Sequence, residues 1–162
     1  MTALKHKNFP NDRLLFLGDI ENLAWDQSLN TVTVSSIQQI SFAVHTKFTQ
    51  YNAQEVIATS HHFAKKVWFA WGRTTRRLLG SGPDGADRKL IDLINNEDIA
   101  QRFTSVIIGS GDGIFAEPAA QLAAQGLHIT AAYGSGGLSK RLALAAHETI
   151  QLFTPKQTEK VA

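Results

Sequence analysis

Acidic side chains follow two apolar segments of the sequence, at the point where each segment ends. Asp19 comes directly after the run 14–18, and Asp112 comes after the run 106–108 and a Gly-Ser-Gly turn. A near-continuous apolar run is typical of a strand buried in a parallel sheet, and ligands of open α/β sheets bind beyond the carboxyl ends of such strands. We therefore expect Asp19 and Asp112 at one edge of one sheet. Gathered carboxylates repel one another unless they share a proton or a cation, so the pattern predicts metal-dependent chemistry on phosphates.

Other polar residues fall beside these two acids. Asp87 opens a predicted helix within Gly85-Ala86-Asp87, and Asn22 follows Asp19 by three positions. Asp84 and Asp87 are also good candidates for helix caps, because a helix amino terminus favours negative charge. Asn22 either orients a ligand or a water molecule, or closes a turn. Mg²⁺ needs only a few carboxylates besides water and substrate phosphate, and two such ions would activate water and stabilise the leaving oxygen of a phosphodiester.

The elements that must position these residues alternate along the chain. Strands are predicted over 13–18, 55–59, 75–79, 105–108 and 127–133, with a last one over 149–153. Helices are predicted over 36–50, 61–71, 86–95, 118–125 and 139–147, and the segment 23–34 is interpreted as a loop. Alternating strands and helices predict a parallel sheet with helices on both faces.

The segment 61–71 allows two interpretations. Its second half, 67–71, has the composition of a strand. A parallel crossover requires about a dozen residues, however, and a strand there would leave too few after the strand 55–59. We therefore favour a helix that ends at Gly72, with Phe63, Trp68 and Trp71 on its apolar face.

Composition limits the class of protein. The 162 residues are 43% hydrophobic and 19% charged, which fits one globular domain rather than a disordered chain. We place that domain at 13–153, between a polar segment 1–12 and a polar, disordered tail 154–162. The absence of cysteine excludes disulfides and thiolate metal sites and favours a cytoplasmic protein. No apolar run approaches the roughly 18 residues of a membrane span, and no GxGxxG or P-loop motif is present.

Basic residues near the predicted edge are candidates for contacts with nucleic-acid phosphates. The net charge of +2 permits a nucleic-acid partner without requiring one. The candidates are Arg76, Arg77, Arg88, Lys89, Lys140 and Arg141. Each is equally consistent with an ordinary solvated surface. Trp25 is a candidate for stacking on a base, or for a loop anchor.

Three motifs in this order resemble the NYN family, a branch of the PIN-like nucleases. They are Asp19-Ile20-Glu21-Asn22-Leu23, Gly85-Ala86-Asp87 and Gly109-Ser110-Gly111-Asp112, and the resemblance covers roughly residues 13 to 153. It implies a Rossmann-like three-layer α/β/α sandwich with strand order 3-2-1-4-5. It also implies Mg²⁺- or Mn²⁺-dependent cleavage of RNA, with Asp19, Asp87 and Asp112 as metal ligands and Asn22 as the polar residue of the first motif. Relatives of this type often form homo-oligomers.

One position departs from that family. Many relatives carry Asp-x-Asp-Phe where this chain has Asp112-Gly113-Ile114-Phe115, so the second acid is an isoleucine. This leaves open whether one metal or two are bound, and Asp84 or Glu117 are the candidates to compensate. It also keeps a second function open, that of a non-catalytic RNA-binding or regulatory module. A small-molecule phosphatase ranks last, because Asp-x-Asp is absent after the first strand.

Overall fold

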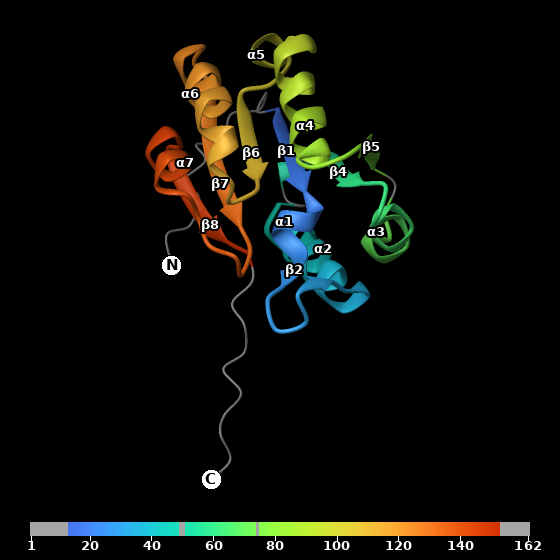
Figure 1. The fold of residues 1–162 in the computed structure, drawn as a ribbon. Coiled ribbons are helices and arrows are strands. Elements are labelled where there is room, and N and C mark those ends of the chain that lie inside the picture. The colour runs from blue at the N-terminus through green and yellow to red at the C-terminus, as the bar shows by residue number, and fades with distance from the viewer. Residues whose placement is uncertain (1–12, 49–50, 74, 153–162) are drawn as a thin grey trace.

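A six-stranded parallel sheet forms the centre of the computed structural model, which describes residues 13–48, 51–73 and 75–152 (Figure 1). Its order is β5-β4-β1-β6-β7-β8, and every neighbouring pair is parallel. The strands are β1 (Leu14–Asp19), β4 (Gln54–Ser60), β5 (Arg76–Gly80), β6 (Ser105–Gly109), β7 (His128–Tyr133) and β8 (Glu148–Gln151). The predicted segment 1–12 and tail 154–162 lie outside the described residues.

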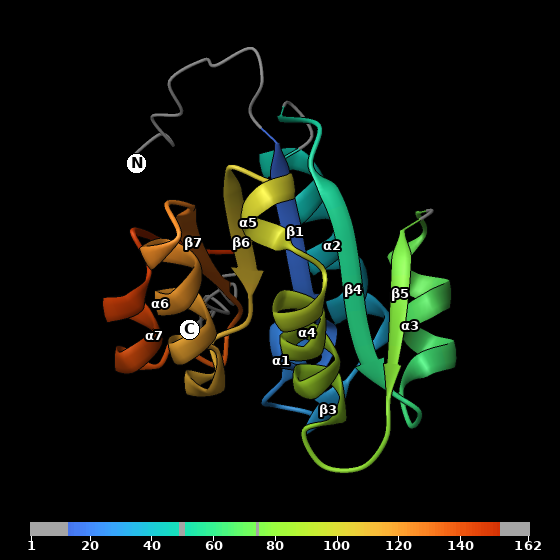
Figure 2. The same ribbon diagram turned by 90° about the horizontal axis from the view of Figure 1, so that it is seen from above.

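The sheet confirms the predicted fold class. Its first five strands follow the expected order 3-2-1-4-5, and β8 extends that order by a sixth strand at the edge beyond β7. Helices cover both faces (Figures 1 and 2). They are α1 (Ile20–Ala24), α2 (Val34–Phe48), α3 (Ala64–Trp71), α4 (Gly85–Asn96), α5 (Ile99–Arg102), α6 (Ala116–Ala124) and α7 (Lys140–Ala145).

Two hydrophobic clusters divide the core between the two faces. Leu15 and Leu17 of β1 belong to the cluster with α4 and α6, whereas Leu14 and Phe16 belong to the cluster with α1, α2 and α3. This division follows from the strand period of two, which sends successive side chains to opposite faces. Both faces are covered, so β1 is apolar throughout until Asp19. The sheet is thus the middle layer of a three-layer α/β/α sandwich.

The segment predicted as a loop over 23–34 is more ordered than expected. It contains the end of α1 and a small hairpin of β2 (Trp25–Asp26) and β3 (Thr31–Val32). The Asp19 side chain starts α1 by accepting a hydrogen bond from the Asn22 N–H at 3.3 Å. The Asp26 carboxylate closes the hairpin loop by accepting from the N–H groups of Ser28 and Leu29. Such short elements depend on caps and turns and carry no hydrophobic periodicity, which is why the sequence pattern missed them and α5 as well.

The helical interpretation of 61–71 is confirmed from Ala64 onward, and Gly72 ends α3 in the left-handed conformation at φ 72°. No helix in the described part of the chain is both long and apolar enough to cross a bilayer.

Close backbone approaches bring the loops of the carboxyl edge together. A Cβ on Gly80 would lie 2.1 Å from the Gly85 carbonyl carbon, and one on Gly111 would lie 2.0 Å from the Gly137 oxygen. Glycine therefore allows α4 to begin directly against the end of β5.

Candidate active site

The predicted acids meet in one pocket at the carboxyl edge of the sheet. Asp19 ends β1, Asp87 lies in the first turn of α4, and Asp112 follows β6. All three line a pocket of about 500 Å³, together with the predicted Asn22. The other residues that line it are Glu21, Trp25, Gln27, Ser60, Gly82, Pro83, Asp84, Gly85, Ala86 and Gly136. Five acidic residues thus line this pocket, and no Lys or Arg of the described chain lines it.

Asp19 and Asp87 form the buried part of this acidic pocket. Each residue is only 5% exposed, and the two carboxyl groups lie close enough for each to change the pKa of the other. Burial, followed by the contact with Asp87, raises the pKa of Asp19 well above its usual range. Burial is also the main cause that raises the pKa of Asp87; Asp112, Asp84 and Glu21 add to it, and the contact with Asp19 opposes it. The pair therefore retains a shared proton to a higher pH than isolated carboxyls would.

One oxygen of this pair lacks a partner. Oδ1 of Asp87 is buried and receives no hydrogen bond within the described residues. Buried carboxylate oxygens nearly always accept hydrogen bonds from protein or water. An oxygen left without a donor, in a pocket of carboxylates, is available to a cation or to a donor group of a ligand.

Asn22 ties the loop after β1 to the loop after β6. Its side-chain Oδ1 accepts a hydrogen bond from the Gly111 N–H at 2.9 Å. The next residue, Asp112, accepts from the Ile114 N–H at 3.0 Å and donates its own N–H to Ser110 Oγ at 3.1 Å. Through this hydrogen bond, Asn22 helps to hold the loop that carries Asp112.

Glu21 has a similar connecting role, which the sequence alone left undecided. Its Oε1 accepts hydrogen bonds from Thr59 Oγ1 at 3.0 Å and from the Ser60 N–H at 2.5 Å. It thereby joins the loop after β1 to the end of β4. The signal in the sequence was its place in the first motif, but the partners on β4 are known only from the tertiary structure.

The acidic residues fit a cation bound with the help of water and substrate. Within the described ranges, no three His, Asp or Glu side chains are already gathered into a metal-binding group. Mg²⁺ commonly uses one or two carboxylates, with waters and substrate phosphates completing its shell. The Asp19–Asp87 pair, with its unpartnered Oδ1, supplies that number of carboxylates, and Asp112 faces the same pocket.

The predicted basic residues fall into two groups. Arg88 and Lys89 are exposed in α4 next to Asp87, and Lys140 and Arg141 are exposed at the start of α7, after the carboxyl end of β7. These four side chains belong to elements that begin at the edge where the acids lie. None of them lines the acidic pocket itself.

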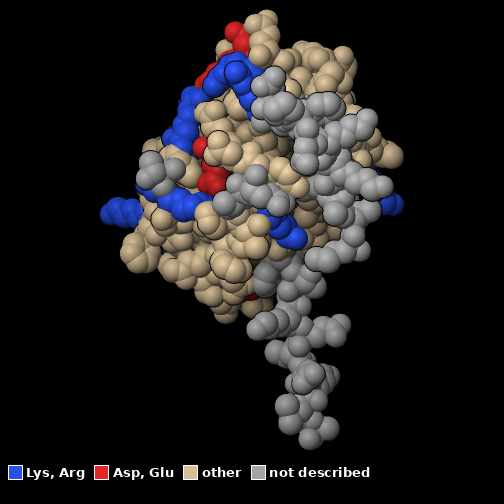
Figure 3. All heavy atoms as spheres, turned by 180° about the vertical axis from the view of Figure 1, so that it is seen from behind, with Lys and Arg blue, Asp and Glu red and all other residues tan. Residues whose placement is uncertain are grey.

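Arg76 and Arg77 lie elsewhere, at the amino end of β5. Arg76 donates two hydrogen bonds of 2.6 Å to Glu97. Arg77 donates to two backbone carbonyls and lies over the Trp68 ring at 5.3 Å. Seen from behind, the side of the molecule that holds β5 carries a run of Lys and Arg side chains with Asp and Glu side chains beside them (Figure 3). The structure does not bring these two arginines to the acidic edge.

Comparison with known proteins establishes the fold. No protein-family model matches this chain, and no curated protein matches its sequence. The chain is similar to a solved structure of a protein of unknown function from Vibrio parahaemolyticus, with a TM-score of 0.58 and 13% sequence identity. The match covers 88% of this chain and 93% of the other. At this identity, the likeness concerns the α/β architecture alone.

Proposed function

We propose that this protein is a metal-dependent ribonuclease that hydrolyses RNA phosphodiester bonds at the acidic pocket. The observation that carries the proposal is the buried Asp19–Asp87 pair. It lies in a pocket of carboxylates without Lys or Arg, and Oδ1 of Asp87 receives no hydrogen bond from the described residues. The resemblance of three ordered motifs to the NYN family supports the same function. A chain without cysteine also suits the reducing cytoplasm, where we propose that it acts.

Each part of the site has a role in this proposal. Asp19, Asp87 and Asp112 hold Mg²⁺ or Mn²⁺, which when bound polarises the phosphate and makes a water molecule more acidic. Asn22 and Glu21 keep the loops that carry the acids in place through their hydrogen bonds to Gly111 and to the end of β4. The four exposed cations of the same edge, Arg88, Lys89, Lys140 and Arg141, contact backbone phosphates, which gives sequence-independent and salt-sensitive binding.

A second function is favoured by one specific observation. Ile114 stands where many NYN relatives have a second acid, and it is 39% exposed near Asp112. An apolar side chain cannot ligate a cation, so the site has one carboxylate fewer than in those relatives. The alternative is a non-catalytic RNA-binding or regulatory module on the same fold.

Cleavage of labelled single-stranded RNA by purified protein with Mn²⁺ tests the choice. We expect cleavage by the wild type, and loss of cleavage both in EDTA and in Asp112→Asn. The asparagine keeps an Oδ1 that accepts from the Ile114 N–H, so the loop is preserved while the charge is removed. Asp92→Asn removes an exposed acid of α4 outside the pocket and should cleave normally.

Two results would contradict this proposal. Cleavage that survives unchanged in both Asp112→Asn and Asp19→Asn would remove these acids from the mechanism. Salt-sensitive RNA binding without any product in Mn²⁺ would favour the non-catalytic module instead.

A further inference from the structure

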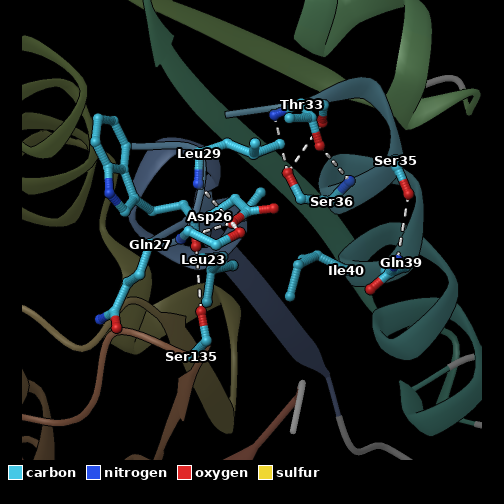
Figure 4. A pocket seen from close by; sticks show the side chains of 13 residues that line it. Leu23, Asp26, Gln27, Leu29, Thr33, Ser35, Ser36, Gln39, Ile40 and Ser135 are labelled. Carbon is cyan, nitrogen blue, oxygen red and sulfur yellow. Dashed lines mark hydrogen bonds between the residues drawn. The ribbon is translucent and has the colours of Figure 1, made fainter. Parts of the chain in front are cut away.

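A second pocket adjoins the acidic one. It has a volume of about 670 Å³ and lies between α1, the β2–β3 hairpin and the first half of α2, with Ser135 entering from the loop after β7 (Figure 4). Trp25 and Gln27 line both pockets. Because they share these two side chains, the two pockets lie next to each other.

The second pocket has an apolar floor. Leu23, Ala24 and Ile40 are buried beneath it, and Leu29 forms a wall from the hairpin loop although 63% of this residue is exposed (Figure 4). Small-molecule sites are mostly apolar with a few polar groups that fix orientation. The size and composition of this pocket suit a flat, partly apolar ring system.

Several polar groups of the pocket are already used by the protein. Ser36 Oγ donates to the Thr33 carbonyl and accepts from the Thr33 N–H, both at 3.0 Å. Ser135 Oγ donates to the Trp25 carbonyl at 3.1 Å. Each of these hydroxyls has already used its single O–H donor, so neither can donate to a ligand.

Asp26 is different, because only one of its two oxygens is engaged. Its Oδ1 accepts from the Ser28 N–H at 2.9 Å, from Ser28 Oγ at 2.6 Å and from the Leu29 N–H at 3.2 Å. The hydroxyl of Ser28 and the Leu29 N–H lower the pKa of Asp26, which keeps it ionised at neutral pH. Its Oδ2 accepts no hydrogen bond from the described part of the chain. The pocket therefore offers one free, charged acceptor beside an apolar floor.

We propose that this second pocket binds one unstacked nucleobase of the RNA whose phosphate lies at the acidic pocket, and that Asp26 Oδ2 accepts a hydrogen bond from the exocyclic amino group of that base. The proposal rests on the proposed function. Proteins read single-stranded RNA through splayed bases held on their hydrogen-bonding edges, and carboxylates accept from base amino groups. Asp26 would repel a phosphate, which favours the base over the backbone. Adenine, cytosine and guanine carry an amino group and uracil does not, so the pocket selects against uracil.

Oligonucleotides that differ at a single nucleotide in an otherwise uniform strand test this selection. Binding is measured in EDTA, and cleavage is mapped with Mn²⁺. We expect the wild type to disfavour uracil roughly tenfold at one position next to the cleaved bond, the size of effect that one charged hydrogen bond gives. Asp26→Asn keeps Oδ1 for the hairpin turn and replaces Oδ2 with an N–H donor. It should reverse the preference toward uracil, whose O4 is an acceptor.

Two further variants separate base selection from general effects. Leu29→Ala removes an apolar wall and should weaken binding of all four bases to a similar degree. Asp92→Asn makes the same change of charge outside both pockets and should leave the preference as it is in the wild type.

The outcomes distinguish this proposal from the ribonuclease itself. Equal binding of all four bases by the wild type, or an Asp26→Asn variant with unaltered preference, would overturn the nucleobase pocket even if RNA is cleaved. A base preference in EDTA that reverses in Asp26→Asn would support the pocket even if no cleavage occurs. In that second case only the hydrolytic function would fail.

Discussion

The carboxyl groups of Asp19 and Asp87 lie close together in the buried part of the acidic pocket. The described chain supplies no Lys or Arg to the pocket that they line. Burial and mutual repulsion both disfavour the doubly ionised state, and burial raises the pKa of each acid. Such an arrangement reduces the stability of the protein, and in the proposed function a bound cation would offset this cost.

A pH dependence of stability follows from these raised pKa values. Below the ordinary carboxyl pKa of 3.8, both acids are protonated in the folded and unfolded chains and contribute no difference. Above it, the unfolded chain releases protons while the folded pair retains one. The free energy of unfolding therefore falls as the pH rises from the pKa of the unfolded chain to the raised pKa of the folded pair. The total loss is about 1.4 kcal/mol for each unit by which the pKa in the folded protein exceeds the pKa in the unfolded chain.

We therefore expect Asp19→Asn to raise the melting temperature of the metal-free protein at pH 7–8 and to flatten its decline above pH 4. Thermal unfolding in EDTA across this range measures both effects, and Asp92→Asn should follow the wild-type curve. If the melting temperature of the wild-type protein instead rose with pH over this range, the pKa values of Asp19 and Asp87 would not be raised in the folded state.

At the scale of elements, the site depends on how closely one element begins where another ends. The end of β5 and the start of α4 touch through Gly80 and Gly85 without any side chain between them. Asp87 lies in the first turn of α4, so this contact sets the depth at which its carboxylate enters the pocket. The loops after β6 and β7 meet in a similar way at Gly111 and Gly137.

Gly80→Ala should therefore disturb the site without changing any acid. Its Cβ would meet the Gly85 backbone at 2.1 Å, and overpacking of this kind costs roughly 1–3 kcal/mol. We expect a lower free energy of unfolding in denaturant titrations, together with weaker Mn²⁺ binding as α4 shifts. Gly136→Ala is the control for stability alone, because its Cβ would meet nothing within 4 Å and its φ is not positive, whereas its place in the lining of the acidic pocket makes it unsuitable as a control for Mn²⁺ binding. Equal stability of the two variants would contradict the close contact.

At the scale of the whole molecule, the two ends of the sheet differ in charge. The carboxyl edge holds the acids in its pocket and exposed cations at the starts of α4 and α7. At the amino end of β5, Arg76 forms an ion pair with Glu97, and Arg77 donates to two backbone carbonyls. The proposed path of the RNA therefore runs over the carboxyl edge and leaves the other end uncovered.

Paired substitutions at the two ends test this path. We expect Lys140→Ala with Arg141→Ala to weaken RNA binding and to reduce the slope of log K against log salt by about 0.7 for each lost phosphate contact. Arg76→Ala with Arg77→Ala removes the same number of charges and should leave that slope as in the wild type. RNA-binding titrations at several salt concentrations measure this slope. A larger change in the Arg76→Ala, Arg77→Ala variant would indicate that the RNA binds at the amino end of β5 instead.

The architecture, and the sheet edge at which the acids lie, could be predicted from the amino-acid sequence. Apolar runs that end in Asp19 and Asp112 required buried parallel strands, and parallel strands must open their loops on one edge. The order of the five main strands followed from the family resemblance, whereas the position of β8 beside β7 depended on pairing that no local pattern records. The small hairpin at 25–32 was missed because it is held by the Asp26 turn and not by periodicity.

The contacts among the acidic residues could not be predicted from the sequence. Which carboxyls touch, and which oxygen of Asp87 has no donor among the described residues, depends on distances between elements far apart in the chain. The same holds for Asn22, whose partner Gly111 lies 89 positions away, and for Arg76, which the packing of α4 against β5 directs to Glu97. Residue type and spacing indicate the proposed chemistry, but close packing of the backbone sets the contacts among the residues that would perform it.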